Sequence, residues 1–234
     1  MEATLISYEG KLTRPELALV PTPAGTATHR PIPHVEVVEA LVETLGFRHI
    51  AVHKDEYAVS KDGMKMFGLM ELETVQNGVR FAIGIRNAHD KSMRLAMTVG
   101  YRVLVCENMA FHGDFEPVLA KHTKNFNLKA ALSVGVDDMQ RNFTPMVQAI
   151  ESWQGSLLNA DRARLIIYEA FVEGQLEAPK HLARMVHDQY FNSADPTFWG
   201  ISNAFTAAFK ELEPVPQFKA TNSLAGFLEQ VQRN

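Results

Sequence analysis

Two histidines and two aspartates near the middle of the chain have side chains that can do chemistry. His89 is followed directly by Asp90, and His112 lies two residues before Asp114. An aspartate can orient a histidine as a general base, and these four side chains can also bind a divalent cation. Adjacent strand residues point to opposite faces, however, so a polar turn explains His89 and Asp90 equally well. Whether the chain is an enzyme therefore stays open.

The sequence lacks the motifs that mark the common cofactor, metal and hydrolase classes. It has no HExxH, CxxC or EF-hand loop, and no GxxxxGK[ST], GxGxxG or GxSxG. These spacings matter because they place ligands or backbone N–H groups around the bound group. We therefore predict no cofactor and no metal. Cys106, the single cysteine, follows an apolar run and is interpreted as a buried structural residue rather than a nucleophile.

Charge is unevenly distributed along the chain. The whole sequence has a net charge of −4, yet residues 80–130 hold eight Lys and Arg against four Asp and Glu. A basic window in an acidic chain can hold an anion such as a nucleic-acid backbone, although a solvated surface gives the same pattern. The predicted nucleic-acid-binding residues are Arg80, Arg86, Lys91, Arg94, Arg102, Lys121 and Lys124.

The first half of the chain predicts a helix followed by antiparallel strands. Prolines among residues 1–34 indicate an irregular arm, and apolar residues at helical spacing indicate a helix over 35–45. Alternating residues on both sides of Lys54 and Asp55 predict a strand pair, and Asn-Gly at 77–78 predicts a second hairpin. The predicted strands are 47–53, 56–60, 64–74, 79–86 and 101–106.

The second half of the chain predicts helices, with Asp161 as a cap and Pro179 and Pro196 at first helical positions. The predicted helices span 128–158, 161–173, 179–191, 196–212 and, as a short final segment, 223–230. The fold class is therefore α+β, with an N-terminal helix and an antiparallel sheet followed by a C-terminal helical region. Its expected divisions are an arm (1–34), an α/β region with hairpins (35–127), a helical region (128–212) and a tail (213–234).

Composition is typical of a soluble globular protein, with 46% hydrophobic and 21% charged residues. The N-terminal residues lack the basic start and apolar core of a signal peptide. No apolar run approaches the roughly 20 residues that a membrane helix needs. A single cysteine fits a reducing compartment. We therefore expect a cytoplasmic protein without membrane contact.

Four motifs carry a resemblance to a known family: GIRNAHDKSM (84–93), GYRVLVCENMAF (100–111), KHT (121–123) and FWGISNAFT (198–206). Together they resemble the phage/plasmid-like family named domain of unknown function 932. The resemblance covers roughly residues 35–212, and it implies a protein of mobile elements, where recombination, replication and defence are common tasks. The family has no accepted activity, so no catalytic residue is implied. A looser similarity in strand and helix order is to the β-β-β-α core of single-strand-annealing recombinases.

Three functions are compatible with these features. The first is binding of single-stranded DNA in recombination or replication, through the basic window. The second is a metal-dependent hydrolase or nuclease that uses His89, Asp90, His112 and Asp114. The third is a protein-binding inhibitor of a host defence complex, with a host protein as partner. A homo-oligomer is also expected if the apolar surface of the helical half is not all internal.

Overall fold

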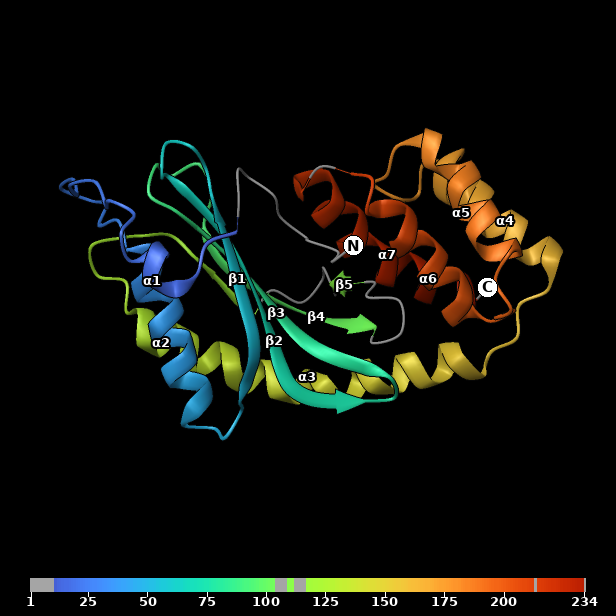
Figure 1. Ribbon diagram of the computed structural model, residues 1–234, viewed down its shortest axis with the longest axis horizontal. Helices are drawn as coiled ribbons and strands as arrows, with labels where there is room; N and C mark the ends of the chain where they lie inside the picture. The colour runs from blue at the N-terminus through green and yellow to red at the C-terminus, as the bar shows by residue number, and fades with distance from the viewer. Residues whose placement is uncertain (1–10, 104–108, 112–116, 213, 234) are drawn as a thin grey trace.

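A curved antiparallel sheet followed by a group of helices confirms the predicted α+β fold (Figure 1). The computed structural model describes residues 11–103, 109–111, 117–212 and 214–233. The sheet packs on the long helix α3 (Leu128–Gly155), and the helices that follow α3 gather at one end of the molecule. No helix in these described ranges is long and apolar enough to cross a membrane.

The sheet has six strands in the described part of the chain. Five of them are neighbours in the order β1-β2-β3-β4-β5, and β6 also pairs with β4. β5 pairs with residues 100–102 and β6 with residues 95–97, so both short strands lie along the same edge of β4. The strands are β1 (Val52–Val59), β2 (Lys65–Gln76), β3 (Val79–Ala88), β4 (Leu95–Val103), β5 (Met109–Phe111) and β6 (Val118–Ala120).

The predicted hairpin at Asn77 and Gly78 is confirmed. The φ angles of these residues are 52° and 76°, and positive φ at both central positions is what a type I′ turn requires. β2 and β3 therefore pair from the turn to Lys65 and Ala88, with an irregularity between Glu71 and Val75. This pairing places the end of β3 far from the turn, at the opposite end of the sheet.

The prediction of two paired strands around Lys54 and Asp55 is wrong. β1 runs through both residues and pairs with β2 instead. Asp55 lies within a strand because its carboxylate accepts hydrogen bonds from Arg14 Nε and from the Tyr57 hydroxyl, the latter at 2.6 Å. Arg14 comes from the expected arm, which also forms a bridge between Leu12 and Tyr57. A contact distant in sequence thus outweighs the local turn signal.

In the described part of the chain, each predicted helix has a counterpart in the structure. The residues at which the helices begin and end differ from the prediction. Asn159, not Asp161, caps α4, because the Asn159 side chain accepts from Arg162 N at 2.8 Å. The final helix is far longer than the predicted 223–230, since it begins at a proline that needs no N–H partner. The helices are α1 (Arg14–Leu17), α2 (His34–Gly46), α3, α4 (Ala160–Phe171), the 3-10 helix η1 (Lys180–Leu182), α5 (Ala183–Phe191), α6 (Phe198–Phe209) and α7 (Pro214–Arg233).

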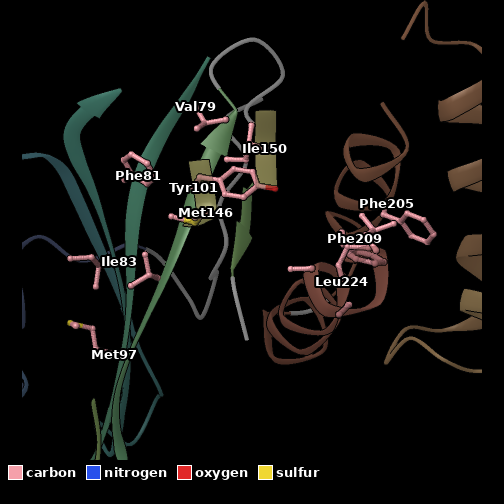
Figure 2. Packing of buried hydrophobic residues seen from close by; sticks show 14 of the residues in the cluster. Val79, Phe81, Ile83, Met97, Tyr101, Met146, Ile150, Phe205, Phe209 and Leu224 are labelled. Carbon is pink, nitrogen blue, oxygen red and sulfur yellow. The ribbon is translucent and has the colours of Figure 1, made fainter. Parts of the chain in front are cut away.

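A continuous apolar core joins the sheet to the helices (Figure 2). Nearly all residues of β3 and of residues 95–102 in β4 are buried, and Phe81 stacks on Phe143 of α3 with ring centroids 4.4 Å apart. Tyr101 lies 5.8 Å from the Trp199 ring of α6. Figure 2 places Phe209 of α6 close to α7 at the far side of this core. The core therefore holds the sheet, and with it the end of β3, in a fixed position.

Candidate functional site

Four buried histidines meet where β3 ends. His29 precedes α2, His34 begins α2, His89 follows β3, and His122 follows β6. Their exposed fractions are 8, 1, 3 and 5% respectively. The rings of His34 and His89 stack with centroids 3.9 Å apart, and those of His29 and His122 stack at 5.8 Å. We call these four residues the histidine cluster.

Hydrogen bonds fix the neutral tautomer of His34 and hold the ring of His89 in place. His34 Nε2 lies 3.0 Å from the carbonyl oxygen of Gly63, and its Nδ1 lies 2.8 Å from Asn87 Nδ2. A carbonyl oxygen only accepts and an amide nitrogen only donates, so the proton of His34 is on Nε2. His89 Nε2 donates to the carbonyl oxygen of Ile32 at 2.9 Å, and Asn87 donates to the same oxygen at 3.0 Å. These bonds tie the start of α2 to the end of β3.

Burial is the main reason that these imidazoles resist protonation. Burial, together with the charges of the neighbouring histidines, lowers the pKa of His34 to about 4 and that of His122 to about 4. Burial also lowers the pKa of His89, and the hydrogen bond to Ile32 opposes this effect only in part. A neutral imidazole keeps one N–H donor and one lone pair available for a ligand.

His29 is held differently from the other three residues. Its Nδ1 lies 2.8 Å from the carbonyl oxygen of His122, and its Nε2 lies 3.0 Å from that of His89. Both oxygens can only accept, so both hydrogen bonds form together only when the His29 ring carries two N–H groups. These two contacts join His29 to the segments that carry His89 and His122.

The segment before α2 is folded tightly to deliver His29. Thr26 N donates to the carbonyl oxygen of His29 at 2.8 Å, and His29 N donates to Thr26 Oγ1 at 3.2 Å. A Cβ atom at Gly25 would lie 2.9 Å from the same carbonyl oxygen, so only glycine fits there. A backbone bridge then joins His29 to Thr123. This part of the expected irregular arm is therefore ordered, and it forms one wall of the site.

A cavity of about 540 Å³ opens beside the histidine cluster. Its described lining contains three side chains with positive charge, Lys91, Arg94 and Lys121, each of them exposed. None of the described residues that line it carries a carboxylate. The remaining lining residues are Thr28, His29, Ala88, Ser92, Met93, His122 and Thr123. This combination of cations, hydroxyls and imidazoles is suited to an anion.

His122 lies in the wall of this cavity with both ring nitrogens unused. Neither Nδ1 nor Nε2 has a hydrogen-bond partner among the described residues, and both are shielded from solvent. A buried donor without a partner costs on the order of 1–3 kcal/mol. A ligand in the cavity would remove this cost once the His122 ring turned one of its nitrogens toward it.

Comparison of the sequence with known protein families identifies the family of this chain. The model of the family described as domain of unknown function (DUF932) matches residues 26–225. The chain belongs to the DUF932 family. The matched part begins at Thr26, so it includes the whole histidine cluster and the described lining of the cavity. No curated protein and no solved structure matches the chain.

The predicted nucleic-acid-binding residues of this DUF932 chain fall into two groups. Lys91, Arg94 and Lys121 meet at the cavity, and Lys124 is exposed just beyond Thr123. The motif at 84–93 therefore has a physical role, because it ends β3, contributes His89 and turns at Lys91, whose φ is 64°. Asp90 holds this turn by accepting from Ser92 N at 2.9 Å.

The other predicted cations lie on the sheet, and two of them, Arg80 and Arg102, are paired with acidic residues. Arg102 Nη2 lies 3.1 Å from Glu71 Oε1, and Arg80 Nε lies 3.9 Å from Glu71 Oε2. Arg80 also pairs with Glu73 at 3.8 Å. Both Arg102 and Glu71 are buried. Arg86 is half-buried on β3. It lies on the same face of the strand as Arg80 and Ala82.

The proposed acid–base residues are not assembled as a pair. The His89 ring bonds to the Ile32 carbonyl oxygen inside the cluster, whereas the Asp90 carboxylate is exposed, near Lys65 and Ser92. His112 and Asp114 lie outside the described residues, as does Cys106. Among the residues that are described, no group of three or more His, Cys, Asp or Glu could hold a metal ion.

Three residues of the site were not predicted from the sequence. Thr28, His29 and His34 lie in the expected arm, and His122 appears in the sequence analysis only within the KHT motif (121–123). One sequence signal could have indicated this part of the site, namely the run His29-Arg-Pro-Ile-Pro-His34. Its prolines favour an extended segment, whose backbone carbonyl oxygens can accept hydrogen bonds from side chains. Ile32 in that run supplies the carbonyl oxygen that Asn87 and His89 share.

Proposed function

We propose that this DUF932 protein binds nucleic acid, most effectively single-stranded DNA, by phosphate contacts at the cavity beside the histidine cluster. The observation that carries the proposal is the convergence of Lys91, Arg94 and Lys121 on one cavity whose described lining has no carboxylate. Phosphate contacts from Lys and Arg supply most of the affinity of proteins that bind nucleic acid without reading its sequence.

The shape of the site favours a single strand over a duplex. A duplex is a stiff rod with a persistence length of about 150 base pairs, and it holds its phosphates on its outer surface. A single strand can bend so that one phosphate enters a cavity. The paired arginines Arg80 and Arg102 leave the sheet face less able to serve as a flat basic surface for a duplex. A role in recombination or replication of a mobile element would use such strand binding.

Fluorescence anisotropy with a labelled single strand and its duplex tests the proposal. The wild-type protein should bind the single strand more tightly, and affinity should fall as salt is raised. A variant with Lys91→Gly, Arg94→Ala and Lys121→Ala should bind at least tenfold more weakly. Lys91→Gly is chosen because glycine tolerates the positive φ at this position.

The matched control removes three exposed cations that lie away from the cavity: Lys129→Ala, Arg141→Ala and Arg184→Ala. This control has the same net charge as the cavity variant and should keep wild-type affinity. Equal weakening in both variants would mean that only overall charge matters, which contradicts the proposed site. Absence of binding to either DNA at low salt would rule out the proposed function.

A further inference from the structure

We infer that the cavity beside the histidine cluster binds a phosphomonoester, the terminal phosphate of a nucleic-acid strand, rather than a phosphodiester within the strand. This inference rests on the proposed function, which it makes more specific. Three observations support it: the size of the cavity, the donors and charges that line it, and the histidines beside it.

Size is the first argument. A volume of about 540 Å³ falls within the range of about 300–1,000 Å³ that is typical of small-molecule sites. The cavity can therefore hold one nucleotide-sized group, and it is not a long groove. Along the sheet, the other predicted cations Arg80 and Arg102 are paired with Glu71, so the described sheet does not extend the site as a track for successive phosphates.

The donors are the second argument. A phosphomonoester has three terminal oxygens and carries a charge between about −1.5 and −2 at pH 7, whereas a diester has two such oxygens and a single charge. The cavity offers Lys91, Arg94 and Lys121 as charged donors. Hydroxyl groups of Thr28, Ser92 and Thr123 also line it. This number of donors and charges suits the monoester better than the diester.

The histidines are the third argument. His122 is 95% buried and both its ring nitrogens lack partners in the described part of the chain. One N–H of the neutral ring can donate to a phosphate oxygen. Beside it, the His29 ring stacks on His122 and is held by two backbone carbonyl oxygens, so this wall of the cavity is fixed in place. A phosphate bonded to His122 would supply the hydrogen-bond partner that this imidazole lacks.

The experiment compares one single-stranded oligonucleotide in four forms: with a 5′-phosphate, with a 3′-phosphate, with hydroxyl groups at both ends, and as a closed circle. Competition against a labelled 5′-phosphorylated strand gives the relative affinities. One phosphorylated form should compete at least tenfold better than the hydroxyl-ended and circular forms. The form that does so also identifies which end the cavity receives.

Two variants tie this preference to the cavity. Lys121→Gln removes an exposed cation and should reduce the preference for the phosphorylated strand without affecting folding. His122→Leu should abolish the preference for the phosphorylated strand. Lys129→Gln, an exposed change on α3 outside the cavity lining, should keep the full preference. If His122→Leu fails to fold, the Lys121→Gln and Lys129→Gln pair still decides the question.

Free dTMP and inorganic phosphate show whether the cavity binds the phosphate at the end of a strand or a free small molecule. Competition by dTMP at millimolar concentration supports the inference, and it should be lost in Lys121→Gln. Equal binding of all four strand forms would overturn the inference and leave the proposed function standing. Binding of dTMP with no binding of any strand would do the reverse: the phosphomonoester site would stand, with a free nucleotide as its ligand, and the proposed function would fail.

Discussion

Buried neutral histidines should make the fold sensitive to mild acid. The folded pKa of His34 and of His122 is about 4, whereas an unfolded histidine has a pKa of about 6.5. Between these values the unfolded chain binds more protons than the folded chain, so the free energy of unfolding falls as the pH decreases from about 6.5 toward 4. The expected loss at pH 5 is on the order of 2 kcal/mol for each histidine.

Urea denaturation at pH 7, 6 and 5 measures this loss. The His34→Gln variant should be less stable than wild type at pH 7 and should lose less stability on going to pH 5, because one of the two titrating groups is gone. Replacement of His53, which is exposed, should leave the pH dependence as in wild type. A wild-type unfolding free energy that stays constant from pH 7 to pH 5 would contradict the prediction.

The histidine cluster also shows why single residues of the site were hard to predict. His29 bonds to the carbonyl oxygens of His122 and His89, which lie 93 and 60 residues away in the sequence. No periodicity or short motif reports contacts of that range. The basic residues were easier, because Lys91 and Lys121 stand out by charge alone. Charge did not reveal which cations would form ion pairs. Arg102 and Glu71 lie on different strands, and only the register of the sheet brings their side chains together.

At the scale of elements, the close packing of α3 on β6 positions one wall of the cavity. A Cβ atom at Gly135 would overlap the Val118 side chain and lie 3.2 Å from the carbonyl oxygen of Pro117. We therefore expect Gly135→Ala to push β6 away and to destabilise the fold by about 1–3 kcal/mol. Because Lys121 and His122 directly follow β6, the same change should weaken DNA binding.

Thermal unfolding and anisotropy on Gly135→Ala check this expectation. The control is Gly155→Ala at the end of the same helix, where an added Cβ meets nothing within 4 Å. That control should be neutral or gain up to about 1 kcal/mol, since alanine favours helix. Unchanged DNA affinity in a destabilised Gly135→Ala protein would show that β6 does not set the position of the cavity wall.

Elements with local signals were the predictable part of the fold. Asn77 and Gly78 define their turn by their own φ preferences, so the hairpin was predicted from two residues. α2 was predicted from apolar periodicity. β1 was misread because Lys54 and Asp55 resemble a turn, and the partner that keeps Asp55 in a strand is Arg14, 41 residues away. Local patterns therefore failed where a tertiary contact satisfied a polar side chain.

At the scale of the whole molecule, the distribution of charge limits how nucleic acid can bind. The chain has a net charge of −4, so long-range attraction to DNA is weak and contact depends on the local excess of cations. Arg80 and Arg102 are already paired with Glu71. The three cations that line the cavity, Lys91, Arg94 and Lys121, are therefore expected to make the main phosphate contacts.

The salt dependence of binding tests this distribution. Each neutralised phosphate of a single strand contributes about −0.7 to the slope of log affinity against log salt. A cavity whose three cations hold one terminal phosphate therefore gives a shallow slope, and the slope is no steeper than about −2 even if each cation contacts a separate phosphate. Participation of all seven predicted cations would give about −5 instead. Lys121→Gln should make the slope shallower, and Lys129→Gln should leave it unchanged. A wild-type slope near −5 would mean that the basic residues on the sheet also contact DNA, which would require Arg80 and Arg102 to leave Glu71 when the strand binds.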